Sequence, residues 1–216
     1  QATSIGGKNF VYNLESLAEI EPDLIIAAQD GTDALRAGAR ELGLPLFVLD
    51  FPASITEVLA QLRTIGRLLG AAESADTLIT DLQARINAVA AERENTSPLR
   101  VYLEGDQSTP AHPFSVGPGS IHDEIVTLSG GVNIFADADI DFPQTNWEAI
   151  IERDPEVILL LDSKEFADEL AFNPVSVDEV IERTGWHLIS AVRRNQVVPL
   201  PNDLFSVGVG LVDALE

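Results

Sequence analysis

Short apolar runs alternate with amphipathic segments at the start of the chain. Their spacing predicts a helix at 14–20, a strand at 24–28, a helix at 33–42 and a strand at 46–50. A strand, a helix and a second strand in succession favour parallel pairing, as in an α/β lobe. Because so few strands do not make a stable sheet by themselves, we expect the N-terminal part of this lobe to be missing from the chain.

The middle of the chain is helical and contains no predicted strand. Ser54-Ile-Thr-Glu57 is a capping box that starts an amphipathic helix, and Gly70 ends it. A second amphipathic helix is predicted at 74–93, where a helix of this length reaches about 30 Å. We expect that helix to be long enough to cross from one lobe to another.

The rest of the chain again alternates strands and helices. The predicted elements are a strand at 100–104, a helix at 120–129, a strand at 132–135, a helix at 147–153, a strand at 157–161, a helix at 177–184 and a strand at 196–199. A last helix is expected to begin at Gly210 and to be unfinished at Glu216. The predicted fold class is α/β: two Rossmann-like lobes with parallel sheets, joined by a long backbone helix. The expected divisions are a partial N-terminal lobe at 1–55, a helical linker at 56–94 and a C-terminal lobe at 95–216.

A fifteen-residue unit occurs twice, at Asn13–Ala27 and at Asn146–Leu160. In each copy an Asn can cap a short helix, a Glu lies in its first turn, and an acid followed by Pro stops the helix before a buried strand. The repeat predicts two similar halves that face each other across a cleft, which is where small ligands usually bind. The alternative is that helix, Pro and strand recur by chance, as they can in any α/β protein.

The net charge of the chain argues against nucleic acid as a partner. The formal charge is −22, from 35 acids against 13 bases, and nucleic acid needs a basic surface instead. The acids are scattered, as on a solvated surface, although some could dock a basic partner. The chain has no Cys, no apolar run long enough to span a bilayer, and no phosphate-binding, dinucleotide or nucleophile motif. We therefore expect no enzyme and no resident cofactor.

Candidate ligand contacts lie in the loops that follow the predicted strands, because ligands meet parallel sheets at their carboxyl ends. The best single segment is Phe114–Ser120, which offers an aromatic ring, flexible backbone and free N–H groups at a helix start. Its alternative is an ordinary turn in which Ser120 caps Asp123. The predicted ligand-binding residues are Tyr12, Asn13, Gln29, Asp30, Phe51, Phe114, Ser115, Gly117 and Trp186.

Two aromatic residues leave alternatives open. Trp186 follows a helix-ending Gly and is either a ligand contact or a packed side chain. Tyr12 could stack on a macrocycle or ligate haem iron, or could be a surface residue. His112, His122 and His187 lack the spacing of metal ligands, so we expect no metal site.

Four motifs occur in a specific order along the chain. They are Gly117-Pro-Gly-Ser-Ile-His-Asp-Glu-Ile-Val126, Gly130-Gly-Val-Asn-Ile-Phe-Ala-Asp137, Asp154-Pro-Glu-Val-Ile-Leu159 and Gly185-Trp-His-Leu-Ile-Ser-Ala-Val192. Together with the long middle helix they resemble the helical-backbone (class III) substrate-binding proteins of ABC importers for ferric siderophores, haem and cobalamin. The resemblance covers nearly the whole chain. Two departures are the absence of a first strand-helix-strand unit and of a Pro-Gly-Pro-Arg-like element near the C-terminus.

The resemblance implies a function, a location and partners. It implies a periplasmic or extracytoplasmic protein, lipid-anchored or free, that captures a metal chelate between its lobes and delivers it to an ABC permease. It also implies one acid on each lobe that docks on arginines of the permease; the positions that match best are Asp33 and Asp178, with Glu179 as a substitute. We expect a monomer. The alternatives are a sensor or scaffold domain, a bare-metal binding protein, and an enzyme on paired lobes like those of nitrogenase, where cluster binding needs Cys.

Overall fold

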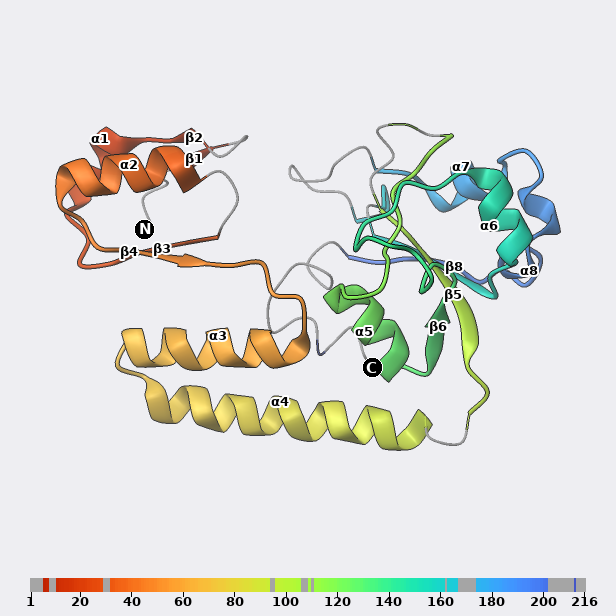
Figure 1. Cartoon of the computed structure of the whole chain (residues 1–216), viewed down its shortest axis with the longest axis horizontal. Helices are drawn as coiled ribbons and strands as arrows, with labels where there is room; N and C mark the ends of the chain where they lie inside the picture. Colours follow the sequence, from red (N-terminus) through yellow and green to blue (C-terminus); the bar gives the residue numbers. More distant parts are fainter. Residues whose placement is uncertain are drawn as a thin grey trace. The chain divides into compact units, whose positions relative to one another are not determined.

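The computed structural model describes residues 6–7, 11–28, 32–93, 96–105, 109, 111–161, 163–166, 174–201 and 212. The chain divides into two compact units, residues 1–51 and 52–216 (Figure 1). The helices that we expected to form a separate linker at 56–94 belong to the second unit. The helix predicted from Gly210 lies outside the described residues, apart from Val212.

The first unit is a small α/β layer. Its parallel strands β3 and β4 pair from Ile25 opposite Leu46 to Ala28 opposite Leu49, and a short antiparallel ladder joins β1 to β2. The core beneath the helices is formed by Leu17, Ile25, Leu35 and Ala39. The elements are β1 Gly6–Gly7, β2 Val11–Tyr12, α1 Leu14–Ile20, β3 Ile25–Ala28, α2 Thr32–Leu42 and β4 Leu46–Leu49.

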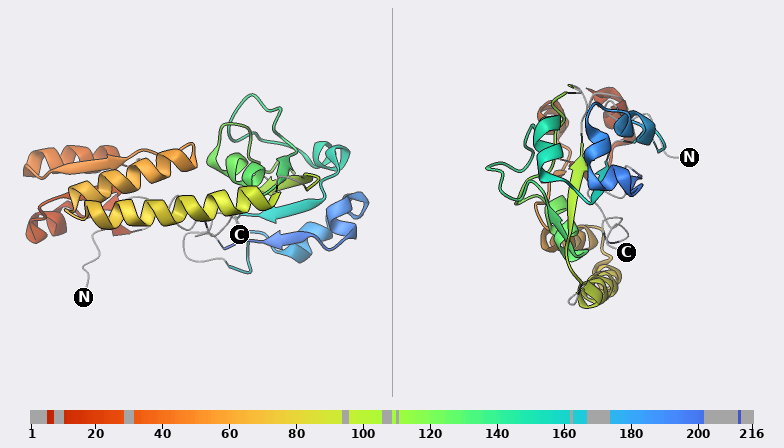
Figure 2. Two further views of the ribbon diagram at one scale, coloured as in Figure 1. Left: turned by 90° about the horizontal axis from the view of Figure 1, so that it is seen from below. Right: turned by 90° about the vertical axis from the view of Figure 1, so that its right-hand side faces the viewer.

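The second unit begins with two long helices, α3 Ile55–Leu68 and α4 Ala72–Arg93, which lie side by side (Figures 1 and 2). The predicted N-terminal cap of α3 is present, because the Ser54 hydroxyl accepts a hydrogen bond from the Glu57 N–H at 3.2 Å. The helices approach closely at Gly66, where an added Cβ would lie 2.3 Å from the Cβ of Ala75. Only glycine fits this crossing without moving a helix.

A four-stranded parallel sheet forms the centre of the second unit, in the order β6-β5-β7-β8. Its strands are β5 Leu99–Glu104, β6 Gly131–Asn133, β7 Val157–Leu160 and β8 Val197–Pro199. The connecting helices are α5 Ile121–Leu128, α6 Trp147–Arg153, α7 Val177–Ile181, the 3₁₀ helix η2 Trp186–Leu188, and α8 Ser190–Arg193. The α/β class with parallel sheets is thus confirmed, whereas β1, β2, η2 and α8 were not predicted.

The sheet is covered by helices on both faces. Alternate residues of β5 point to opposite faces: Val101 and Leu103 pack in one core cluster with α3, α4 and α5. Tyr102 packs in the other cluster, which includes α6, α7, η2 and α8. The connection from β5 to β6 through α5 therefore runs along one face, and the connection from β6 to β7 through α6 runs along the other. This reversal makes the boundary between β5 and β7 the topological switch point of the sheet.

Candidate functional site

The carboxyl edge of the four-stranded sheet carries the loops that can meet a ligand. Open parallel sheets bind ligands outside the carboxyl ends of the strands at the switch point, here between β5 and β7. Glu104 is the last residue of β5, and its carbonyl accepts a hydrogen bond from the Leu161 N–H, just after β7, at 2.9 Å. The segments after β5, β6 and β7 all begin at this edge.

The segment after β5 returns across the end of its own strand. Glu104 and Ser115 form an isolated antiparallel bridge, and the Gly105 N–H donates to the Phe114 carbonyl at 2.9 Å. The Ser115 hydroxyl donates to the Leu103 carbonyl at 2.8 Å. The segment is therefore held to β5 by both backbone and side-chain hydrogen bonds.

A second layer of pairing uses the backbone N–H groups that we had expected to be free for a ligand. The Ser115 N–H donates to the Pro143 carbonyl at 2.9 Å, and the Gly117 N–H donates to the Asp141 carbonyl at 2.7 Å. An added Cβ at Gly117 would lie 2.1 Å from the Ile140 carbonyl oxygen, so glycine permits this close approach. The expectation of free N–H groups at Ser115 and Gly117 is wrong, because distant loop residues take them. The Ser120 cap on the Asp123 N–H is present at 3.2 Å.

A buried ion pair lies directly behind this segment. Two nitrogens of Arg183 contact the two carboxylate oxygens of Glu104 at 2.6 and 2.8 Å, and the Glu104 side chain is 0% exposed. The guanidinium lies 4.5 Å from the centre of the Trp186 ring and 5.6 Å from that of Trp147. Burial raises the pKa of the Glu104 carboxyl, and the charge and hydrogen bonds of Arg183 oppose that rise. Burial and the adjacent Glu104 raise the pKa of Tyr102 well above its ordinary value.

The segment after β7 is tied to the start of α7. Ser163 and Val175 form a parallel bridge, and the Val177 N–H donates to the Glu165 carboxylate at 3.0 Å. Lys164 pairs with Glu179 at 2.5 Å. Burial would raise the pKa of Glu165, but the hydrogen bonds from Val177 and Ser163 outweigh it and lower that pKa. The short helix α7 is thus bound at its start to residues 163–166, here called the β7 loop, and to β5 through Arg183 just beyond its end.

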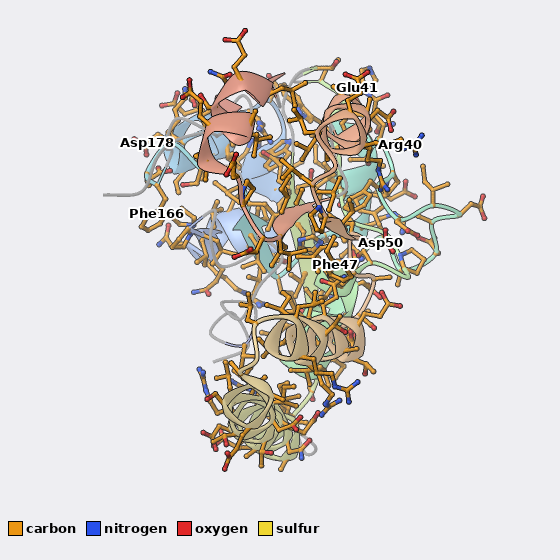
Figure 3. The ribbon with its side chains drawn as sticks, turned by 90° about the vertical axis from the view of Figure 1, so that its left-hand side faces the viewer. Arg40, Glu41, Phe47, Asp50, Phe166 and Asp178 are labelled. Carbon is orange, nitrogen blue, oxygen red and sulfur yellow. The ribbon has the colours of Figure 1, made fainter. Side chains whose placement is uncertain are left out.

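Exposed apolar side chains lie on the segments that follow β6 and β7. Phe142 is 46% exposed and Ile140 is 59% exposed, both after β6. Phe166, after β7, is 47% exposed (Figure 3). Phe114 is half-buried. Sequence reasoning missed Phe142, Ile140 and Phe166; the alternation of acid and apolar residues at 139–142 was the available signal. The rings of Phe142 and Phe166 can offer flat apolar contacts to a ligand.

The sequence-predicted contacts of the first unit are less closely defined. Asn13 caps α1 by accepting a hydrogen bond from the Ser16 N–H at 3.1 Å, so its side chain has a structural role. Tyr12 lies on β2 opposite Gly6. Phe51 follows β4 and Asp50 in the sequence and is 53% exposed. Gln29 and Asp30 lie outside the described residues.

Trp186 does not line this edge. Its side chain is fully buried in the core between β5 and the outer helices, with ring contacts to Tyr102 and Trp147. A ring with no exposed surface does not touch a ligand, so the predicted contact at Trp186 is replaced by a packing role. Ser115 is similarly 1% exposed and bonds inward.

The two predicted permease-docking acids are both exposed. Asp33 lies in the first turn of α2. Asp178, which is labelled in Figure 3, lies in the first turn of α7. The helix dipole favours acids at these positions whether or not a partner binds there. Their docking role stays a prediction.

In the described part of the chain, no group of three or more His, Asp or Glu side chains is placed to hold a metal ion. None of the described helices is long and apolar enough to cross a membrane.

Known proteins show similarity to most of the chain. A protein of Halobacterium salinarum named cobalamin-binding protein is 27% identical over 184 residues, which cover 83% of this chain and 48% of that protein. A vitamin B12-binding protein of Yersinia pestis is 28% identical over 165 residues, which cover 74% of this chain and 56% of that protein. The chain thus spans about half the length of the curated relatives that it matches.

Solved structures share the fold. The periplasmic heme-binding protein HutB of Vibrio cholerae superimposes with a TM-score of 0.81 at 18% identity, covering 95% of this chain and 79% of that chain. The sequence model described as periplasmic binding protein matches residues 6–204. Because this match spans most of the chain, the protein belongs to the periplasmic binding protein family.

Proposed function

We propose that this chain is the solute-binding component of an ABC importer and that its cargo is a large metal chelate. Cobalamin is the first candidate for that cargo. The observation that carries the proposal is the family match over residues 6–204, together with relatives named for binding cobalamin and vitamin B12. Ferric siderophores and haem are the other cargoes of the same chemical class. The mechanism is capture and release without covalent chemistry.

The loops at the carboxyl edge of the second unit support this class of cargo. Phe142 and Phe166 are 46% and 47% exposed, and Phe114 is half-buried. Aromatic rings bury large area at little entropic cost and stack on flat macrocycles such as a corrin or porphyrin. In the first unit, Phe51 offers a similar exposed ring after β4.

Delivery would need contact with a membrane permease outside the cytoplasm. Exposed Asp33 and Asp178 suit arginine side chains of such a partner, because carboxylate and guanidinium form paired, charge-assisted hydrogen bonds. Neutralising both acids is expected to abolish uptake in cells while leaving chelate affinity unchanged. A loss of affinity in the same double variant would instead assign these acids to the ligand.

Equilibrium dialysis with cyanocobalamin, haemin and ferric siderophores of the hydroxamate and catecholate classes tests the proposal. Dialysis suits this protein better than tryptophan quenching, because Trp186 is fully buried and therefore reports poorly on ligand contact. Saturable binding of one chelate at about micromolar concentration or below is the expected result. Folded protein that retains none of these chelates would overturn it.

A further inference from the structure

The Glu104–Arg183 ion pair is the most thoroughly buried pair of opposite charges in the described part of the chain. The two side chains are 0% and 6% exposed and meet through two hydrogen bonds. The other ion pairs of the described residues are more exposed: Arg63 and Asp76 are 45% and 61% exposed, and the carboxylate of Glu156, which pairs with Arg100, is 20% exposed. Burying two charges costs desolvation energy that apolar residues would avoid, so their retention calls for a specific role.

Its place in the fold indicates what that role is. Glu104 ends β5 at the switch point of the sheet, and its backbone contacts both loops of the candidate site. Its carbonyl accepts from Leu161 after β7, and the residue bridges to Ser115, beside Phe114. A shift of Glu104 would therefore move the segment that carries Phe114.

Arg183 holds the other side of this junction. It follows α7, and its guanidinium packs over the rings of Trp186 and Trp147. The start of α7 is fastened to the β7 loop by Glu165 and Lys164. The ion pair thus closes a ring of contacts that runs from β5 through Arg183 and α7 to the β7 loop.

We propose that Glu104 and Arg183 are positioning residues for ligand binding: the buried ion pair fixes the end of β5 so that the Phe114–Gly117 segment and the β7 loop keep their binding geometry. Neither side chain touches the ligand. The inference rests on the proposed function for its affinity readout, but its conformational readout does not need a ligand.

The ion pair gives the test a distinctive pH dependence. In an Arg183→Met variant the Glu104 carboxylate would be buried without its countercharge, and the end of β5 must open to hydrate it. Protonation of Glu104 at lower pH would remove the charge and restore the geometry. Among the described residues, the charged or titratable groups that face Glu104 are Arg183, from the turn after α7, and Tyr102, on its own strand. Tyr102 is neutral throughout because its pKa is raised.

The experiment measures the affinity for cyanocobalamin and haemin at about pH 8 and about pH 5.5, each relative to the unaltered chain. Arg183→Met is expected to weaken binding about tenfold at the higher pH and to regain most of it at the lower. The variant Glu104→Gln with Arg183→Met removes both charges and is expected to lose the pH dependence. Arg100→Met is the matched control. Arg100 lies on the same strand as Glu104, but near the opposite end of it, and pairs with the carboxylates of Asp154 and Glu156.

Amide hydrogen exchange provides the second arm. The N–H groups of Gly105, Ser115 and Gly117 are expected to exchange about tenfold faster in Arg183→Met at the higher pH, whereas those inside β7 change less. Unchanged exchange and unchanged affinity would overturn the proposal, as would equal acceleration throughout the sheet. If the unaltered chain binds neither these two chelates nor the ferric siderophores, the proposed function fails and the exchange arm still decides this inference.

Discussion

Asn13 and Asn146 occupy the same place in two copies of one structural unit. Each lies before a short helix and accepts a hydrogen bond from the backbone N–H three residues later, at 3.1 Å from Ser16 and at 2.8 Å from Ala149. Both helices then end in a left-handed acid, Glu21 with φ 47° and Asp154 with φ 43°. The repeat recognised in the sequence is therefore a repeat of backbone conformation, down to its caps.

Removing one cap tests how much the unit depends on it. Asn146→Ala is expected to lower the free energy of unfolding by about 1 kcal/mol, because the Ala149 N–H loses its partner. Asn146→Asp should retain most of that energy, since a carboxylate caps equally well. Urea unfolding followed by circular dichroism measures both. Equal stability of all three proteins would show that the cap contributes nothing.

The two left-handed acids should respond in opposite ways to glycine. Glu21→Gly relieves an unfavourable backbone conformation and is expected to raise stability by up to about 1 kcal/mol. Asp154→Gly relieves the same strain but loses the carboxylate that accepts hydrogen bonds from the Ser190 N–H at 2.7 Å and from its hydroxyl at 2.9 Å.

Asp154→Gly is therefore expected to lower stability by about 1–3 kcal/mol. Differential scanning calorimetry compares the two variants under one set of conditions. Changes of the same sign at both positions would contradict this account.

Local hydrogen bonding explains why so much of the fold could be predicted. The caps at Asn13, Ser54 and Asn146 depend on residues three positions apart, and these fix the helix starts correctly. Apolar spacing likewise located the strands of the four-stranded sheet within two residues of their observed ends. Such signals lie within one turn or one strand of the sequence.

The candidate site was predicted less well because it depends on contacts between distant residues. Gly117 looked like a flexible donor, but its N–H is taken by Asp141 from another loop. Trp186 looked like a rim residue after a glycine, but it lies in a short 3₁₀ helix that packs on Tyr102. The partnership of Glu104 with Arg183 joins residues far apart in the chain and has no periodic signature.

Burial separates aromatic residues that stabilise the fold from those that can serve a ligand. Trp186→Ala is expected to lower the free energy of unfolding by about 3–5 kcal/mol, because a fully buried ring is lost from the core. Phe166→Ala should change it by less than about 0.5 kcal/mol.

Phe166 is expected to matter for the affinity for cyanocobalamin although it matters little for stability. Phe166→Ala should weaken binding about tenfold, or about 1.4 kcal/mol, when measured by dialysis. Ile181→Ala, an exposed position on α7, is the control and should leave affinity unchanged. If Phe166→Ala and the control bind alike, Phe166 is not part of the site.

The ion pair at the start of α7 should stabilise the protein only above acidic pH. Hydrogen bonds from Lys164 and from the backbone and hydroxyl of Ser176 lower the pKa of Glu179 to about 2. A carboxyl whose pKa is lower in the folded state contributes stability that is fully present above the unfolded value, about 4.3, and is lost as the pH falls through the folded value. Since the Glu179 side chain is 51% exposed, solvent screening limits this contribution to less than about 1 kcal/mol.

The difference in unfolding free energy between the unaltered chain and Glu179→Gln is therefore expected to be constant from about pH 7 to about pH 5.5 and to vanish toward about pH 2. Urea titrations at low salt along this range measure it, with Glu182→Gln as a control that removes one charge from the end of the same helix. A difference that grows as the pH falls would contradict the proposed direction of the pKa shift.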